Sequence, residues 1–232
     1  MNKPLLVSLI VAALVLVGVA GATSFRSSSN SSVLMGAINQ NSTWSCDQSV
    51  NLTSVTIMNP TGDAVLIKAG CTGYIGMITV VDNSGDPIHI GNAQNLEIGN
   101  VNLTCNGHNS TVHQDGIQVM GGTNIRIDSG YVGCYSANDS QMMIHGGTGG
   151  SIPTNVIING VTVDPRGAGA YGVTNGKSKK SGFTCLKFDS LANRHDLYWG
   201  GASAAPNPVW SFQSPILAGL RSNFNYTQYP TC

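Results

Sequence analysis

Two stretches in the middle of the chain decide the fold: Asp86–Cys105 reads DPIHIGNAQNLEIGNVNLTC, and Asp115–Cys134 reads DGIQVMGGTNIRIDSGYVGC. They align without a gap over twenty residues, and the alignment pairs residues of the same kind. The pairs are Asp86 with Asp115, Ile88 with Ile117, Ile90 with Val119, Asn95 with Asn124, Ile98 with Ile127, and Cys105 with Cys134. Such self-similarity is the signature of a repeat architecture.

Related copies begin earlier, at Asp63, and later, at Met143. The equivalent isoleucines of the four copies are 23, 29 and 31 residues apart: Ile75, Ile98, Ile127 and Ile158. Each copy contains short alternating apolar runs, which are typical of strands, and a unit of this size cannot bury its own apolar face. The sequence therefore predicts an all-β fold, a single-stranded right-handed parallel β-helix. A β-sandwich is the alternative, but it would not require the same residue types at the same offset in successive copies.

The repeat divides the chain into four parts. Residues 61–166 are expected to form the β-helix coils, and residues 23–60 a polar tether and an N-terminal cap. Residues 167–232 are expected to form the last coils and an irregular C-terminal segment, with further strands at Phe183–Phe188, Leu197–Trp199 and Val209–Phe212. An atypical closing segment is needed to cover the apolar face of the last coil.

The first 22 residues read as a secretory signal peptide. Lys3 precedes an apolar stretch, and Ala20-Gly21-Ala22 supplies the small residues of a cleavage site. An uncleaved membrane anchor is the alternative, because the apolar stretch approaches the roughly 20 residues that cross a bilayer. We expect a secreted, extracellular or cell-wall protein, with no membrane attachment after cleavage.

The charge balance excludes several classes of protein. The chain has 11 Lys+Arg, 11 Asp+Glu and only 9% charged residues, with 29 Gly. A nucleic-acid binder would need a basic excess, and a helical bundle would need more charge on its outer faces. We therefore expect no nucleic-acid partner, and we expect a monomer.

Six cysteines, an even number, suit an exported protein with disulfides, although six cysteines allow 15 pairings. Because neighbouring coils lie at disulfide distance, stacking favours Cys105–Cys134, with Cys46–Cys71 near the first coil and Cys185–Cys232 at the tail. Seven asparagines begin N-x-S/T sequons that a eukaryotic host could glycosylate: Asn30, Asn41, Asn51, Asn102, Asn109, Asn138 and Asn225.

The register also assigns side chains to the inside and outside of the coils. Ile88, Ile90, Ile117 and Val119 should point inward, and His89 and Gln118 should project outward beside each other. Glu97 and Arg126 should form an exposed ion pair on another face. Asn95, Asn124 and Asn155 should share a corner, where asparagine tolerates left-handed backbone and its amide can bond to the next copy.

The densest group of polar residues is His108–Gln118, HNSTVHQDGIQ. Here His113 is the candidate base and Asp115 its partner, and His89, Gln118 and His145 are candidate substrate-binding residues. The alternative is that Asp115-Gly116 is a turn that His113 merely solvates. Asp63, Asp86 and Asp115 fall at one offset in three coils, so either local turns consume these carboxylates or a cation such as Ca²⁺ bridges them.

The segment His113–Ile127, HQDGIQVMGGTNIRI, resembles the H-x-D-G-[IV]-Q segment and the following coil of secreted right-handed parallel β-helix proteins of the pectate-lyase-like superfamily. The similarity covers about residues 60–165. It implies a three-faced coil, an extracellular setting and, in many members, activity on acidic or neutral polysaccharides, although the fold also hosts non-catalytic adhesins. The chain departs from polygalacturonase-type hydrolases in lacking their paired aspartates and Arg-x-Lys, and from pectate lyases in offering few basic residues beside its acidic ones.

Two functions follow as hypotheses. In the first, the protein is a polysaccharide lyase in which His113 abstracts the proton α to a uronate carboxyl and Asp115 orients His113 or holds a cation. In the second, it is a non-catalytic carbohydrate-binding or structural surface protein, which low charge and repeated Asn and Thr rows also suit.

Overall fold

The computed structural model describes residues 33–105, 114–135, 140–146, 151–166, 171–190, 197–199, 209–212 and 232. Within these ranges every regular element is a strand and every strand pairing is parallel. The chain is therefore a parallel β-solenoid, and the prediction of an all-β, coiled fold is confirmed. The signal peptide and tether predicted for residues 1–32 lie outside the described residues.

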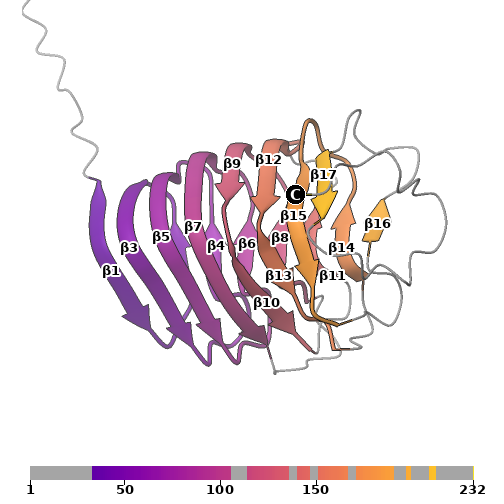
Figure 1. Ribbon diagram of the computed structural model, residues 1–232. Helices are drawn as coiled ribbons and strands as arrows, with labels where there is room; N and C mark the ends of the chain where they lie inside the picture. The colour runs from indigo at the N-terminus through magenta and orange to yellow at the C-terminus, as the bar shows by residue number, and fades with distance from the viewer. Residues whose placement is uncertain are drawn as a thin grey trace, which may run out of the picture. The chain divides into compact units, whose positions relative to one another are not determined.

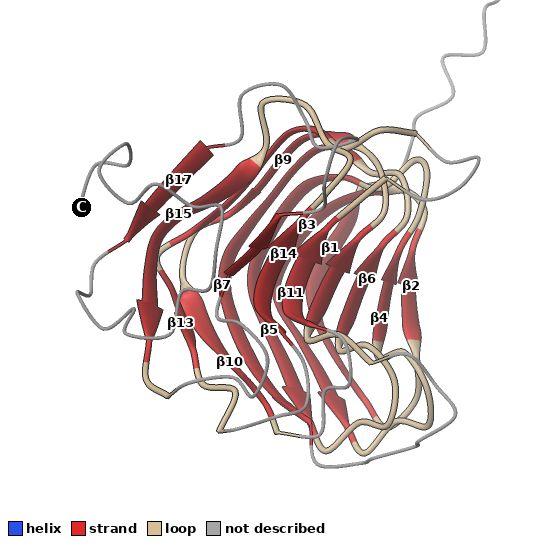
Figure 2. Ribbon diagram, turned by 90° about the vertical axis from the view of Figure 1, so that its right-hand side faces the viewer, coloured by secondary structure: helices blue, strands red, loops and turns tan. Residues whose placement is uncertain are grey.

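Each coil passes through two sheets. One sheet, which we call the first face, has seven short strands in spatial order along the stack. They are β2 (Trp44–Cys46), β4 (Val65–Ile67), β6 (Ile88–Ile90), β8 (Ile117–Val119), β11 (Ser140–Ile144), β14 (Tyr171–Asn175) and β16 (Leu197–Trp199). Figure 2 shows β2, β4 and β6 following one another on one side of the coils.

The other sheet has ten strands and covers the remaining two faces. Its strands are β1 (Leu34–Gln40), β3 (Ser49–Met58), β5 (Thr72–Val81), β7 (Gln94–Cys105), β9 (Thr123–Ile127), β10 (Gly130–Cys134), β12 (Thr154–Asn159), β13 (Val161–Val163), β15 (Gly182–Phe188) and β17 (Val209–Phe212). The early strands are long and lie side by side (Figure 1). The first part of β7 pairs with β9 and its last part with β10, so each long strand contributes to a second face and then to a third.

The predicted columns are present inside the stack. Ile75 pairs in register with Ile98, Ile98 with Ile127, and Ile127 with Ile158, and none of these side chains is exposed. On the first face Ile88 pairs with Ile117 and Ile90 with Val119, also fully buried. Each such side chain contributes about 1.5–3 kcal/mol by leaving water, and a short strand gains this only because its neighbours supply the other walls.

The asparagine corner forms as the sequence predicts. Asn95, Asn124 and Asn155 have φ angles of 50°, 55° and 54°. Asn124 Nδ2 donates to Asn95 Oδ1, and Asn155 Nδ2 donates to Asn124 Oδ1, both at 2.9 Å. Asparagine suits these positions because it tolerates left-handed backbone and because its amide is both donor and acceptor.

Three disulfides cross-link the chain with the expected pairing: Cys46–Cys71, Cys105–Cys134 and Cys185–Cys232. The second joins neighbouring coils, because Cys105 lies directly across from Cys134 in the β7–β10 ladder. Structural disulfides persist in oxidising compartments, which agrees with an exported protein.

The paired strands continue beyond both ends of the segment 61–166 that was expected to form the coils. At the start, β2 and β3 already pair in register with β4 and β5, and β1 adds one further strand on β3. The described strands therefore begin at Leu34, within the segment predicted as a tether and cap. Towards the end, the strands expected at Phe183–Phe188, Leu197–Trp199 and Val209–Phe212 are found as β15, β16 and β17. Among the described residues, no helix is long and apolar enough to cross a membrane.

Candidate functional site

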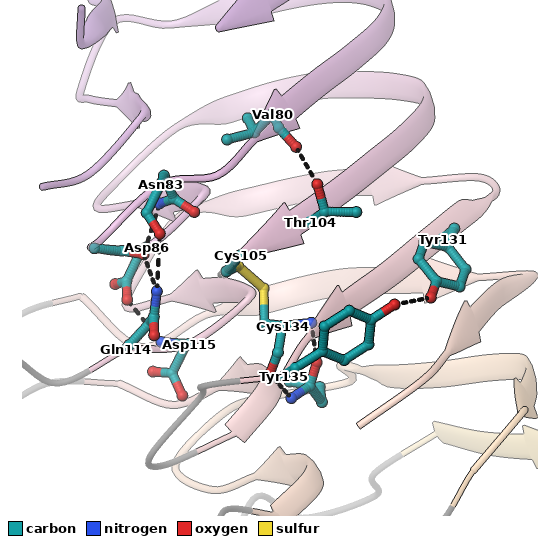
Figure 3. Close-up of a disulfide and its surroundings, with 12 residues drawn as sticks. Val80, Asn83, Asp86, Thr104, Cys105, Gln114, Asp115, Tyr131, Cys134 and Tyr135 are labelled. Atoms are coloured by element: carbon teal, nitrogen blue, oxygen red, sulfur yellow. Dashed lines mark hydrogen bonds between the residues drawn. A yellow bond between two sulfur atoms is a disulfide. The ribbon is translucent and has the colours of Figure 1, made fainter. Parts of the chain in front are cut away.

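A ladder of aspartates runs along the edge at which each coil enters the first face. One oxygen of each carboxylate accepts a backbone N–H from the next coil (Figure 3 shows Asp86 and Asp115). Asp63 Oδ1 accepts from Asp86 N at 3.0 Å, Asp86 Oδ1 from Asp115 N at 2.7 Å, and Asp115 Oδ1 from Ser140 N at 2.7 Å. Each stacked aspartate is thus fixed by a backbone donor of the next coil, an arrangement that differs from the local turns of the first alternative that the sequence left open.

The second oxygens of Asp86 and Asp115 each meet a side chain three residues further on, and that of Asp63 meets His89 of the next coil. His89 Nδ1 lies 3.4 Å from Asp63 Oδ2 and 3.6 Å from Asp86 Oδ2. On the next coil Gln118 Nε2 donates to Asp115 Oδ2 at 3.1 Å. His89 and Gln118 occupy equivalent positions, since they pair directly in the β6–β8 ladder. Asp63, Asp86 and His89 are the described residues whose ligand atoms converge, within 4.8 Å of one another.

The electrostatics of this group follow from the contacts. The hydrogen bond to Asp63 raises the pKa of His89 above its ordinary value, against the opposing effect of burial. Burial alone would raise the pKa of Asp63, but His89 and the backbone N–H of Asp86 outweigh it and lower that pKa. The imidazole of His89 and the carboxylate of Asp63 therefore stabilise each other's charged forms.

Of the two candidate catalytic residues, Asp115 lies within the described residues. His113 lies outside the described residues. Asp115 is fully buried, and its two oxygens accept the bonds from Ser140 and Gln118 described above. The Asp115 carboxylate therefore links its own coil to the next one through Ser140. The sequence had suggested either a turn at Asp115-Gly116 or a partner for His113.

The candidate substrate-binding residues share the first face but form no single cluster. His89 lies beside Gln118, and Gln118 lies beside Met143. His145 is two residues beyond Met143, so about 12 Å of sheet separates its Cα from that of His89. Gln118 is only 8% exposed, so it faces its neighbours more than solvent.

The second face carries an exposed column that spans several coils. Asn51 pairs with Tyr74, Tyr74 with Glu97, Glu97 with Arg126, and Arg126 with Ile157. We call these five residues the second-face strip. Asn51, Tyr74, Glu97 and Arg126 are exposed, and Ile157 is half-buried. A shallow hollow of about 240 Å³ lies at one end of the strip, between Arg126, Ile157 and the corner asparagines Asn124 and Asn155.

The prediction of an ion pair between Glu97 and Arg126 within this strip is wrong. Arg126 lies beside Glu97 in the ladder, but its guanidinium pairs with Asp128. Asp128 is two residues along the same strand region, on the same side of the chain, so it reaches Arg126 without crossing to another coil. Glu97 is left at the surface of the strip.

A second polar cluster lies where the third face ends, and sequence reasoning missed it. Tyr131 OH lies 2.9 Å from Tyr135 OH (Figure 3) and donates to Asp164 Oδ2 at 2.9 Å. Arg166 Nε donates to the same Asp164 oxygen at 2.8 Å, and its guanidinium lies 4.3 Å from the Tyr135 ring centre. Ser190 Oγ donates to Asp164 Oδ1 at 2.6 Å.

The charges in this cluster shift the pKa of its members. Burial is the main cause that raises the pKa of Tyr131, and its bonds to Tyr135 and Asp164 add to it. Burial would raise the pKa of Asp164, but the hydrogen bonds from Ser190, Tyr131 and Arg166 outweigh it and lower that pKa. The Asp164 carboxylate is thus the centre of a network that ties three coils together.

Replacing Asp164 by asparagine should destabilise the protein in a pH-dependent way. A carboxylate whose folded pKa is depressed contributes stability above its unfolded value, near 4, and this contribution disappears as the pH falls through the folded value. We expect Asp164→Asn to lower the free energy of unfolding by about 1–3 kcal/mol at pH 6 and by less at pH 3. Urea unfolding at both pH values measures this.

The matched control is Asp189→Asn on the next coil, just after the strand that pairs with β13. Its carboxylate is 41% exposed and pairs with Lys187, which is 52% exposed, so its removal should change stability by less than about 0.5 kcal/mol. A loss for Asp164→Asn that stays the same at pH 3 and pH 6 would contradict the assigned role.

The comparisons with known proteins found no relative of this chain. No family profile matches the chain, and neither the curated proteins nor the solved structures give a match.

Proposed function

We propose that this protein is an extracellular β-solenoid that binds a polysaccharide along the second-face strip. The observation that supports the proposal is the exposure of Tyr74, Glu97 and Arg126 at equivalent positions of three consecutive coils. Adjacent strands lie about 4.8 Å apart, so the strip presents its side chains in a straight row, as a linear polymer requires.

The residue types suit a sugar chain. A tyrosine ring offers a flat apolar surface to the C–H face of a sugar ring and a hydroxyl to its edge. Arginine and glutamate bond hydroxyl groups through charge-assisted hydrogen bonds, and the Asn124 and Asn155 amides border the hollow beside Arg126. The strip is 53% exposed at Arg126 and 41% at Tyr74, so the side chains are accessible.

The position of Asp115 excludes direct contact between its carboxylate and a polymer, because Asp115 has no exposed surface. A buried carboxylate can still orient a histidine base, so the choice between binding and the lyase hypothesis is made by experiment. The likeness to pectate-lyase-like proteins agrees with the parallel solenoid, and the proposed extracellular location agrees with three disulfides. The fold itself serves both enzymes and binding proteins.

Affinity electrophoresis through gels that contain neutral or uronate polysaccharides tests the proposal. We expect at least one polymer to retard the protein, and Tyr74→Ala or Arg126→Ala to weaken that retardation about tenfold, the loss of a central aromatic or arginine contact. Met77→Ala is the matched control, because Met77 lies on the same strand β5 and has the same 41% exposure. Enzymatically deglycosylated protein should be used, since Asn51 begins a sequon beside Tyr74.

The same samples distinguish the competing functions. Ultraviolet absorbance from an unsaturated uronate product would support the lyase hypothesis. Retardation that Tyr74→Ala and Met77→Ala reduce equally, or not at all, would contradict binding at the strip.

A further inference from the structure

We propose that Asp63, Asp86 and His89 form a binding site for a divalent transition-metal ion of the Zn²⁺ type. The site is separate from the second-face strip, and the proposal does not depend on polysaccharide binding. It rests on the convergence of one imidazole nitrogen and two carboxylate oxygens from two neighbouring coils.

The spacing of the ligand atoms fits such an ion. Zinc binds nitrogen and carboxylate oxygen at about 2.0–2.2 Å, so two ligand atoms on a tetrahedral ion are about 3.4 Å apart. His89 Nδ1 lies 3.4 Å from Asp63 Oδ2 and 3.6 Å from Asp86 Oδ2. An ion can therefore enter between these atoms with small side-chain movements.

The backbone fixes the two carboxylates in the orientation that the ion needs. Asp63 Oδ1 and Asp86 Oδ1 each accept an N–H from the following coil, which directs both Oδ2 atoms towards His89 Nδ1. Hydrogen bonds of this kind orient the ligands of metal sites and tune their affinity. The geometry is set by the stacking of coils and needs no loop rearrangement.

The site is open on one side. The side chains of Asp63 and His89 are each 31% exposed, whereas that of Asp86 is 5% exposed. Three protein ligands with a solvent-facing fourth position are the arrangement of open zinc sites. The open side leaves room for water or a further ligand.

The neighbouring coil shows that the ladder does not need an imidazole. Gln118 stands in the position equivalent to His89 and bonds Asp115 Oδ2 at 3.1 Å. An amide thus satisfies the aspartate in the next coil, so the histidine adds something that the amide cannot, namely a nitrogen that ligates metals.

The choice of ion follows from the ligands. Calcium prefers six to eight oxygen ligands, whereas imidazole nitrogen suits zinc, cobalt, nickel and copper. The Ca²⁺ site expected from the sequence consisted of Asp63, Asp86 and Asp115, so it differs from the proposed site in one residue. Asp115 Oδ2 accepts a hydrogen bond from Gln118, whereas His89 faces Asp63 and Asp86.

Calorimetric titration of EDTA-treated full-length protein with ZnCl₂ tests the site, and Co²⁺ absorbance in the visible range reports the ligand geometry. We expect one ion per chain, with at least about 100-fold weaker binding in His89→Gln, since even outer contacts of metal ligands change affinity 10–100-fold. His89→Gln reproduces the Gln118 arrangement, so the metal-free variant should fold. Asp63→Asn, at a partly exposed position, is the second variant.

His145→Gln is the matched control, because His145 is, like His89, a half-buried histidine of the first face, directly after strand β11. It should bind Zn²⁺ as the wild type does. The proposal is overturned if wild-type protein takes up neither Zn²⁺ nor Co²⁺ at 100-fold excess. It is also overturned if His89→Gln and Asp63→Asn retain wild-type affinity, or if His145→Gln loses as much as His89→Gln.

Discussion

Replacing Gly130 by alanine is expected to lower the free energy of unfolding by about 4 kcal/mol. Gly130 begins β10, has a φ of 137°, and lies directly across from Val101 on the preceding coil. A Cβ there would overlap the Val101 carbonyl oxygen and lie 2.7 Å from the Val101 nitrogen. Backbone strain and overpacking cost about 1–3 kcal/mol each, and the neighbouring coil cannot retreat without breaking its own ladder. Chemical denaturation of the purified variant gives the value.

Gly36→Ala separates the two causes. Gly36 in β1 also has a positive φ, 107°, but a Cβ there meets no atom within 4 Å. We therefore expect this variant to lose only the strain contribution, about 1–2 kcal/mol. Equal losses for the two variants would mean that the coils are not packed against each other at Gly130 as described.

Replacing Asp115 by alanine is expected to cost about 2–5 kcal/mol. The change leaves the Ser140 N–H and the Gln118 amide without their acceptor at a site with no exposed surface. An unsatisfied buried donor costs about 1–3 kcal/mol. Asp115→Asn should lose less, because its amide oxygen can still accept one of the two bonds. The midpoint of urea unfolding ranks the variants.

Asp47→Ala serves as the control for Asp115, since Asp47 is an exposed aspartate. It should change stability by less than about 0.5 kcal/mol. If Asp115→Ala unfolds at the wild-type urea concentration, the aspartate ladder does not hold the coils together.

The sequence predicted the columns because the repeat fixes them. Once Ile98 is aligned with Ile127, a period-two strand determines which neighbours point inward, and coil spacing places Cys105 at bonding distance from Cys134. The asparagine ladder followed for the same reason, since one residue type recurs at one corner. These features depend on the backbone path more than on side-chain conformation.

Side-chain partners were harder to predict. Arg126 has Glu97 on the neighbouring coil and Asp128 on its own, and the conformation of a long exposed side chain decides between them. Similarly, the repeat brings Asp63 and Asp86 together, but the sequence does not reveal that His89 reaches both carboxylates while Gln118 satisfies Asp115.

The Tyr131 cluster was missed because it joins residues that the repeat does not match. Tyr131 and Asp164 belong to different copies, 33 residues apart. A signal was available: continuing the alignment of Ile127 with Ile158 places Thr162 beside Tyr131, and therefore Asp164 near the end of β10. The alternation of a strand puts Tyr131 and Tyr135 on the same outer side.

The central claim is that the second-face strip is the binding surface. Hydroxyl-radical footprinting with and without the bound polysaccharide tests this claim most directly. Tyr74 and Met77 are both readily oxidised, lie on the same strand and are equally exposed, so each calibrates the other. The account predicts that the polymer lowers the oxidation rate of Tyr74 severalfold and leaves that of Met77 nearly unchanged. Protection that spares Tyr74 and appears instead on the first or third face would contradict it.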